Sequence, residues 1–487
     1  MRVYLNSKML TGGMLASALA LASTMSFAKP AGNPASILPA PAATAGPAAM
    51  PSTAASPAAA SPAVTPTPAA STSATPSPTP AATPSTGATP VPAPPPPDPV
   101  MVWTLADARA LLGVIRNIEE EGLIPEDYRP EVLSAAIAAG PGTALDETAS
   151  KSFVWLAEDL RDGRTPVTAR VQWFAVDPDV DANSTPALMT KALETHDVAG
   201  VLAGLAPTYS DYQALKAALA ATPKTETRKR AMIRANIDRW RWLPRDLGLL
   251  YLITNVPEFQ LRLATNDRIV RTYRTIVGKP GKTATPQLVE QVEAVVFNPT
   301  WTVPQSIVVG EGLGRQLIGN PASALRQGYK VSRAANGTIT VVQQPGRNNS
   351  LGVMKIDMPN PHAIYLHDTP NHALFNLPVR ALSHGCVRTE NAQILGMTMA
   401  MLGAELSPEL ATQYALSGKY TKVPMTKTFP IYITYFTMAQ DITGKLATFN
   451  DLYGRDAPVL ASFDKPRELK TGQRTSNEAI IKLDNPL

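Results

Sequence analysis

Apolar side chains recur at helical intervals in the part of the chain between residues 99 and 230. Thr104 followed three residues later by Asp107 is typical of a helix start, and Gly122 is typical of a helix end. The positions that follow this spacing are Ala108, Leu111, Leu112, Ile115 and Ile118, then Phe153, Leu156, Ala157 and Leu160, then Tyr212, Leu215 and Leu219. Such stripes usually cover a core, and no reactive side chains gather beside them. We therefore expect residues 99–230 to form a helical support domain.

The pattern changes after Arg230, where apolar and polar residues approach a period of two. Alternation of this kind is typical of strands with one buried face. The turn signals Asn266–Asp267 and Asn336–Gly337 separate such runs. The expected strands cover 253–263, 269–277, 294–297, the surroundings of Val331, 339–342 and 363–367. Residues 231–455 should therefore form a mainly β domain, which makes the fold class α+β.

The N-terminus carries an export pattern. Arg2 and Lys8 precede an apolar run from Met9 to Ala22, and Ser26-Phe27-Ala28 has the small-x-small form of a cleavage site. We expect residues 1–28 to be a signal peptide. Because the run is short for a membrane-spanning helix, cleavage is favoured, and retention as a membrane anchor is the alternative.

Residues 29–98 consist mostly of Ala, Pro, Ser and Thr, and no charged residue occurs between Pro30 and Pro97. Such a composition cannot bury enough apolar surface to offset the entropy of ordering, so we expect a linker. At about 3.1 Å per residue of polyproline II, it could reach roughly 200 Å. A tether held at one end and a free tail both fit this composition. Residues 456–487 are expected to form a C-terminal tail.

The net charge of +5 and the pI of about 9.1 are a mild basic bias. This bias favours acidic surfaces or polyanions without specifying one. No basic run is interleaved with aromatic residues, and export also argues against nucleic acid as a partner.

Cys386 is the only cysteine among the 487 residues, and it follows the expected export signal. A lone thiol sent to an oxidising compartment has no structural partner, so its reactivity is the better reason for its presence. A free cysteine can also be a small apolar core residue, and that alternative stays open. We interpret the chain as an exported cysteine enzyme.

Further candidate residues lie close to Cys386 in the sequence. Tyr365 and His367 alternate along an expected strand, so they should share one face. His367 can take the thiol proton, and Gly385 lets backbone amides approach a developing oxyanion, assisted by the Tyr365 hydroxyl. Arg388, two residues after the cysteine, can hold a carboxylate through two hydrogen bonds. The alternatives are a packed strand tyrosine and a surface arginine.

Metal and cofactor motifs are weak. His362, His367 and His372 recur every five residues, but neither a helix nor a strand places that spacing on one face, so no metal site is expected. Gly281-Lys282-Thr283 is similar to the end of a phosphate-binding loop, but Ile276 stands where its first glycine belongs. We expect no cofactor.

The residues around the cysteine resemble the signature of the L,D-transpeptidase catalytic domain of the YkuD type. His367 is followed after fifteen residues by Ser383-His384-Gly385-Cys386, with Arg388 two positions later. Further segments resemble the large YcbB-type branch, namely Asn236–Pro244, Asn298–Pro304, Pro345–Gly352 and Tyr365–Pro370. With the helical region included, the resemblance covers about residues 100–455.

The resemblance implies a helical scaffold domain followed by a β-sandwich-like catalytic domain with a lid at about residues 305–349. It implies Cys386 as nucleophile, His367 as general base, and Tyr365 with the Gly385 and Cys386 amides as the oxyanion site. The substrate-binding residues that it implies are Ser383, His384, Arg388 and Trp301, with Trp301 packing on the substrate from the edge of the lid.

The resemblance also implies a reaction on peptidoglycan stem peptides in the Gram-negative periplasm. In this family a cysteine thiolate attacks the diaminopimelate carbonyl of a tetrapeptide stem, D-Ala leaves, and an amine of another stem resolves the thioester into a 3→3 cross-link. Such enzymes are acylated by carbapenems. With an uncleaved signal, the protein would stay anchored to the inner membrane.

Several alternatives remain at this stage. Larger relatives carry a small peptidoglycan-binding module after the scaffold domain, whereas only residues 222–229 separate the two regions here, so 1→3 cross-linking stays open. A carboxypeptidase or endopeptidase would use the same residues with water as acceptor. Papain-like and NlpC/P60-like peptidases are disfavoured because His367 precedes Cys386. A non-catalytic wall-binding protein would not need the thiol. The sequence sets no oligomeric state.

Overall fold

The computed structural model describes residues 99–175, 184–310 and 312–467. The expected signal peptide (1–28) and linker (29–98) lie outside these ranges, as do residues 468–487 of the expected tail. Within the described ranges, no helix combines the length and the apolar character needed to cross a membrane.

The helical region starts where the sequence predicts. Helix α2 (Leu105–Asn117) follows Thr104, whose hydroxyl accepts a hydrogen bond from the Asp107 amide at 3.1 Å. The other helices here are α3 (Pro130–Ala139), α4 (Thr143–Asp162), α5 (Thr185–Glu194) and α6 (Val198–Ala203), with 3-10 turns at Ile118–Glu121, Pro125–Tyr128 and Val167–Ala169. The stripes predicted at 108–118 and 153–160 pack together in one core, which confirms them as core positions.

Two further helices join this region to the sheet. Helix α7 (Ser210–Ala221) and helix α8 (Thr227–Trp240) are separated by a short turn. The third predicted stripe, on α7, packs in a core shared with the β region. Trp240 of α8 stacks on Phe436, with ring centroids 4.6 Å apart. The two regions are thus held together by apolar contacts of α7 and α8.

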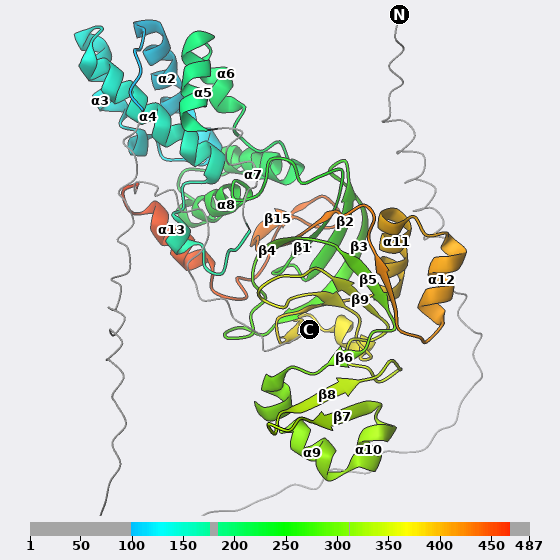
Figure 1. Ribbon diagram of the computed structural model, residues 1–487. Coiled ribbons are helices and arrows are strands. Elements are labelled where there is room, and N and C mark those ends of the chain that lie inside the picture. Colours follow the sequence, from blue (N-terminus) through cyan, green and yellow to red (C-terminus); the bar gives the residue numbers. More distant parts are fainter. Residues whose placement is uncertain (1–98, 176–183, 311, 468–487) are drawn as a thin grey trace, which may run out of the picture. The chain divides into compact units, whose positions relative to one another are not determined.

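One mixed sheet of eleven strands dominates the β region of the described chain (Figure 1). Its strands are β1 (Leu250–Asn255), β2 (Gln260–Thr265), β3 (Arg268–Gly278), β4 (Leu288–Gln291), β5 (Ala294–Phe297), β9 (Met354–Asp357), β10 (Leu366–His367), β11 (Ala381–Ser383), β12 (Val387–Thr389), β13 (Thr421–Pro424) and β14 (Pro430–Thr434). Their order is β13-β5-β9-β10-β12-β3-β2-β1-β14-β4, and β11 pairs with β3. A small hairpin, β15 (Met438–Gln440) and β16 (Leu446–Thr448), follows. A helical region followed by a β region confirms the α+β class.

Two predicted strands need correction. The run 253–263 is not one strand, because the chain turns back before Phe259, whose φ is 57°, and forms the β1–β2 hairpin. The strand predicted at 363–367 is reduced to β10, because Ala363 has a φ of 53° and the Asn360 side chain accepts hydrogen bonds from two following amides. A side chain that bonds the neighbouring backbone in this way favours a turn over a strand.

Helix α11 (Ala392–Ala404) packs beside β5 and β9, and helix α12 (Pro408–Leu416) packs against α11 (Figure 1). Leu395 and Met399 of α11 share the main core of the sheet with Met354 and Ile356 of β9. The face of β9 and its neighbouring strands that points away from α11 is therefore available for a functional site.

The predicted lid segment, about 305–349, forms a compact insertion between the sheet strands β5 and β9 (Figure 1). It follows β6 (Trp301–Thr302) in the chain and contains a π-helical turn (Ser306–Gly310), α9 (Leu313–Gly319), α10 (Pro321–Arg326), β7 (Tyr329–Arg333) and β8 (Ile339–Gln343). The strands form a separate sheet in the order β6-β8-β7, and Val308, Leu317 and Val341 belong to a small core of their own. We refer to Val303–Gln343 as the insertion.

The segment predicted as a C-terminal tail begins with helix α13 (Asp456–Phe463), which packs beside α8. Arg467, after this helix, binds Asp159 of α4 at 3.0 Å and is almost completely buried. Arg164 donates a hydrogen bond to the Ser462 carbonyl at 2.6 Å. The end of the described chain is thus fixed to the helical region.

Candidate active site

The strand register gathers the predicted catalytic residues on one face of the sheet. Strand β10 runs parallel to β12 with Leu366 opposite Val387 and His367 opposite Arg388, and antiparallel to β9 with His367 opposite Lys355. Because paired residues in neighbouring strands point to the same face, His367, Arg388 and Lys355 share a face, and the buried Leu366 and Val387 occupy the other. Tyr365, two residues before His367, lies on the same face as His367.

Cys386 stands immediately before β12, next to Tyr365. The Val387 amide donates to the Tyr365 carbonyl at 3.1 Å, which fixes the two chain segments side by side. The half-buried thiol lies 3.7 Å from the Ala363 carbonyl oxygen. Both the backbone amide and the hydroxyl of Tyr365 are hydrogen-bond partners of the sulfur. Burial raises the pKa of the thiol to about 11, while the Tyr365 amide, Lys355 and Arg388 act in the opposite direction.

The loop before the cysteine is held by its own side chain and backbone. The Ser383 hydroxyl donates to the Cys386 carbonyl at 2.6 Å and accepts from the Gly385 amide at 3.1 Å. Gly385 has a φ of 122°, which side chains with a Cβ rarely adopt, and its carbonyl accepts from the Thr285 hydroxyl at 2.8 Å. His384 is exposed beside this loop. Ser383 therefore shapes the cysteine loop, and the Gly385 amide is already engaged with Ser383.

His367 is buried, with an exposed fraction of 5%. Its Nδ1 atom is buried and has no hydrogen-bond partner among the described residues. Burial lowers the pKa of the imidazole to about 3, and the positive charges of Arg388 and Lys355 add to this effect, while the Asp368 backbone opposes it. The ring is therefore neutral near pH 7 and can accept a proton.

The hydrogen-bond partners of the thiol are Tyr365 and the Ala363 carbonyl, not His367. The Tyr365 and His367 rings lie side by side, with centroids 5.6 Å apart. Among the described contacts, none joins His367 to Cys386 directly. Direct proton transfer from Cys386 to His367 stays a prediction.

Trp301 links the insertion to the site. Its indole is a hydrogen-bond partner of the Tyr365 hydroxyl, which is also bonded to the Cys386 thiol. Trp301 belongs to β6, pairs with Gln343 of β8, and contacts both the main core and the core of the insertion. The predicted substrate role of Trp301 is untested, but the structure gives the residue a place at the edge of the site.

Lys355 is a site residue that the sequence reasoning missed. Its ammonium lies 4.3 Å from the centroid of the Tyr365 ring and 2.8 Å from Asp357. Asp357 also binds Lys422 at 3.0 Å. Strand alternation alone does not reveal Lys355, because its place beside His367 depends on the pairing of β9 with β10.

Arg388 lies beside His367 in the register and is half-buried. Its Nε atom is buried without a hydrogen-bond partner in the described part of the chain, and burial lowers the pKa of the guanidinium. An unpaired guanidinium on the site face can hold a carboxylate, as the sequence predicts.

The turn after His367 is fixed by Asp368. The carboxylate of Asp368 accepts from the Val353 amide at 3.0 Å and lies 3.3 Å from His372, which is exposed. Gly352 has a φ of 62°, and a Cβ there would lie 2.3 Å from the Asp368 carboxylate. This close approach accounts for the glycine at the end of the Pro345–Gly352 motif.

The three evenly spaced histidines do not come together. His362 is buried against Phe174, with ring centroids 4.3 Å apart, and His372 is exposed next to Asp368. Throughout the ranges that the structure describes, no group of three His, Cys, Asp or Glu side chains is arranged to hold a metal ion.

Comparison with known proteins finds similarity in two regions of the chain. Residues 250–398 match the family model described as the L,D-transpeptidase catalytic domain (YkuD), and residues 98–219 match a model described as a scaffold domain. The chain thus carries a YkuD L,D-transpeptidase catalytic domain preceded by a scaffold domain.

One curated relative is a protein of Haemophilus influenzae named "Putative L,D-transpeptidase". It is 29% identical over 248 residues, which are 48% of this chain and 49% of the relative. The chain therefore spans about half the length of this relative.

Two solved structures of L,D-transpeptidases are also similar. The enzyme from Mycobacterium smegmatis is 16% identical, over 38% of this chain and 58% of that one, with a TM-score of 0.19. L,D-transpeptidase 1 of Mycobacterium tuberculosis is 15% identical, over 38% and 61% of the two chains, with a TM-score of 0.17.

Proposed function

We propose that the protein is a peptidoglycan L,D-transpeptidase that forms 3→3 cross-links through a thioester on Cys386. The observation that carries this proposal is the register of β9, β10 and β12. It gathers a neutral imidazole, two cations and a tyrosine around the one cysteine of the chain. The match to the YkuD catalytic domain over residues 250–398 supports the reaction class.

The acylation step needs a proton acceptor and a nucleophile. At neutral pH the thiol and the imidazole are both uncharged, because burial raises the pKa of Cys386 to about 11 and lowers that of His367 to about 3. In the proposed step His367 takes the thiol proton as the sulfur attacks the diaminopimelate carbonyl. The carbon–nitrogen bond to D-Ala then breaks, and the leaving amine receives the proton from His367.

The second step reverses these roles. A side-chain amine of another stem attacks the thioester and loses a proton to His367, and the proton returns to the sulfur of Cys386 as the carbon–sulfur bond breaks. A thioester keeps the acyl group reactive until the amine arrives. Without an amine, water would give a carboxypeptidase or endopeptidase product from the same intermediate.

Charge on the reacting atoms is stabilised by groups already in place. The Tyr365 amide and hydroxyl bond the sulfur, and the Cys386 amide makes no hydrogen bond within the described chain, so it can donate to the oxyanion. The Gly385 amide would have to leave Ser383 before it could contribute. Arg388 and Lys355 suit a stem peptide rich in carboxylates.

Export and recruitment belong to the same proposal. We place the protein in the periplasm, either free after signal cleavage or anchored in the inner membrane, because of the export pattern in residues 1–28. Acylation of Cys386 by a carbapenem is expected from the same nucleophile.

The proposal is tested by incubating the full-length protein with defined tripeptide and tetrapeptide muropeptides and identifying the products by mass spectrometry. The 3→3 dimers should form with the unchanged protein and not with Cys386→Ala. If only 1→3 dimers form, the protein is a 1→3 transpeptidase instead. If only shortened stems form, it is a carboxypeptidase or endopeptidase. No products from the unchanged protein would favour the non-catalytic alternative, and equal products from Cys386→Ala would show that the thiol is not the nucleophile.

A further inference from the structure

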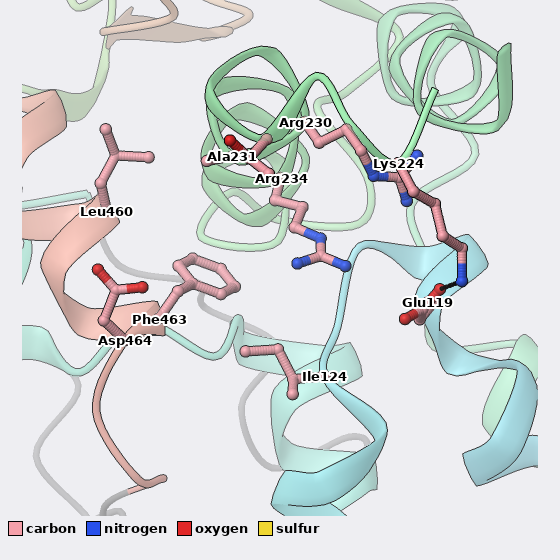
Figure 2. Close-up of a pocket in the computed structure, with 10 residues that line it drawn as sticks. Glu119, Ile124, Lys224, Arg230, Ala231, Arg234, Leu460, Phe463 and Asp464 are labelled. Atoms are coloured by element: carbon pink, nitrogen blue, oxygen red, sulfur yellow. Dashed lines mark ion pairs between the residues drawn. The ribbon is translucent and has the colours of Figure 1, made fainter. Parts of the chain in front are cut away.

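A pocket lies away from the cysteine, between the helical region and helices α8 and α13 (Figure 2). Its volume is about 330 Å³, near the lower end of the roughly 300–1,000 Å³ typical of small-ligand sites. One face of α8, carrying Thr227, Arg230, Ala231 and Arg234, forms a wall of this pocket. The spacing of these residues is that of neighbours on a helix surface.

Arg234 is the central group of the pocket. Figure 2 shows its guanidinium extending from α8 into the hollow, toward Ile124 and Phe463. Its Nε atom is buried and has no hydrogen-bond partner in the part of the chain that the structure describes. In the same part of the chain no carboxylate lies within ion-pair distance of Arg234, whereas Arg239 on the same helix binds Asp456 at 2.6 Å.

A second cation reinforces the positive charge. Arg230 donates to the carbonyls of Leu219 and Thr222, at 2.8 and 2.7 Å, so its guanidinium is held at the pocket wall without a carboxylate partner in the described residues. Burial and the charge of Arg230 both lower the pKa of Arg234. Arg234 is half-buried with its Nε atom enclosed, and a partly buried cation next to a like charge is stabilised when an anion binds it.

The acidic side chains of the pocket are engaged or exposed. Glu119 binds Lys224 at 3.2 Å on the rim, and Asp464 is exposed on the other side. Glu119 and Glu126 act to raise the pKa of Arg234, but burial and the charge of Arg230 lower this pKa by more. The interior of the pocket therefore retains room and charge for an anion.

The rest of the wall is apolar. Ile124, Leu460 and Phe463 line the pocket beside the guanidinium. A ligand that fits must combine an anionic head with a small apolar group next to it. The carboxyl end of a peptide with a short aliphatic side chain has this chemistry, and a guanidinium can bind such a carboxylate through two hydrogen bonds.

We propose that this pocket binds the C-terminal carboxylate of a peptide whose last residue has a small apolar side chain. The inference rests on the proposed function, under which the protein meets stem peptides that end in D-Ala. Under this account the pocket holds a stem of the wall while another stem reacts at Cys386.

The test uses the full-length protein with ¹³C-labelled isoleucine methyl groups, so that Ile124 reports on the pocket by NMR. The Ile124 signal is identified by its loss in Ile124→Val. The probe is N-acetyl-D-alanine, and N-acetyl-D-alaninamide and inorganic phosphate are the comparison ligands. The carboxylate should shift the Ile124 signal in a saturable way, and the uncharged amide should not. An equal shift with the amide or with phosphate would overturn the inference.

Variants on α8 assign the binding to Arg234. Arg234→Met keeps the aliphatic stem and removes the charge, and it should weaken binding at least tenfold, as loss of a charged hydrogen bond implies. Arg228→Met is the matched control, because Arg228 is exposed on the same helix and does not line the pocket, and it should leave the affinity unchanged. Ala231→Leu keeps every charge and fills the pocket, so it should also abolish the shift. This variant serves as the test if Arg234→Met fails to fold. Unchanged affinity in a folded Arg234→Met or Ala231→Leu protein would contradict the inference.

Incubation of the same samples with a tetrapeptide separates this inference from the proposed function. Acylation of Cys386 without any response of Ile124 would overturn the pocket inference alone. A saturable Ile124 shift without acylation would support the pocket and contradict the proposed reaction.

Discussion

The hydroxyl of Tyr365 is a hydrogen-bond partner of the Cys386 thiol. The pKa of this hydroxyl lies well above its usual value because it is buried, so the group remains a proton donor throughout the range in which the enzyme would work. Together with the Tyr365 amide, it stabilises a thiolate that burial otherwise disfavours.

Tyr365→Phe removes the hydroxyl and leaves the amide in place. Acylation of Cys386 by a tetrapeptide should then slow about 10- to 100-fold, the effect of losing one hydrogen bond to a charged group. Single-turnover mass spectrometry measures the rate, and Tyr420→Phe is the control because Tyr420 is exposed on the surface. An unchanged rate in Tyr365→Phe would mean that the hydroxyl does not act on the sulfur.

Lys355 should lower the pKa of the thiol from a distance. With a thiol pKa of about 11, alkylation by iodoacetamide should accelerate up to tenfold per pH unit between pH 7 and 10, without a plateau near 8.5. Lys355→Met should make alkylation several-fold slower at each pH. Lys422→Met is matched to it, since Lys422 binds the same Asp357 from a more exposed position, and should change the rate little. A plateau below pH 9 would show that the thiolate is far more stable than burial allows.

His367 should make the folded protein sensitive to acid. Its pKa falls from 6.5 to about 3 on folding, so the unfolded chain binds more protons between these values. The contribution to stability is complete above pH 6.5 and is lost as the pH falls toward 3, at up to about 1.4 kcal/mol per pH unit. Urea unfolding of the wild type and of His367→Asn should show a shallower acid decline in the variant.

The activity profile offers an independent check on His367. Because the imidazole of the free enzyme stays neutral well below pH 6, kcat/KM should show no loss attributable to this group near pH 6.5. A drop with a midpoint near 6.5 that disappears in a His367 variant would place the ring in a more solvated environment than the structure does.

The sequence predicted the helices with a one-sided apolar stripe and the strands with clear alternation. Thr104 and Asp107 marked the start of α2 correctly because a hydroxyl cap is a local interaction. Helix α11 was missed, because its residues are mostly apolar on every side and give no period. Strand β10 was overestimated because the bonds of Asn360 to the following amides outweigh strand propensity, and those bonds are not visible as a pattern.

The candidate site shows the same limit. Cys386, His367, Tyr365 and Arg388 could be predicted from residue type and spacing. Lys355 could not, because its place depends on the pairing of β9 with β10, which brings together residues that are distant in sequence. The engagement of the Gly385 amide by Ser383 was also invisible, since it depends on the shape of the loop.

Most of the insertion can be removed without interrupting the eleven-stranded sheet. Thr302 and Val342 are paired across β6 and β8, and the Val303 amide donates to the Val341 carbonyl at 2.9 Å, so a two-residue Asn-Gly turn can join Val303 to Val341 in place of residues 304–340. If the insertion is a lid over the donor site, the shortened protein should lose turnover and keep the alkylation rate of Cys386. Unchanged turnover would refute the lid.

The central claim is that Cys386 forms a thioester with the stem peptide. The most direct measurement is intact-protein and peptide mass spectrometry of the full-length chain after rapid mixing with a tetrapeptide stem and acid quenching. The account predicts an added mass on the peptide containing Cys386 equal to the mass of the tetrapeptide minus that of free D-Ala, and this adduct should be removed by an added amine. No adduct on Cys386 while cross-links still form, or the same products from Cys386→Ala, would contradict it.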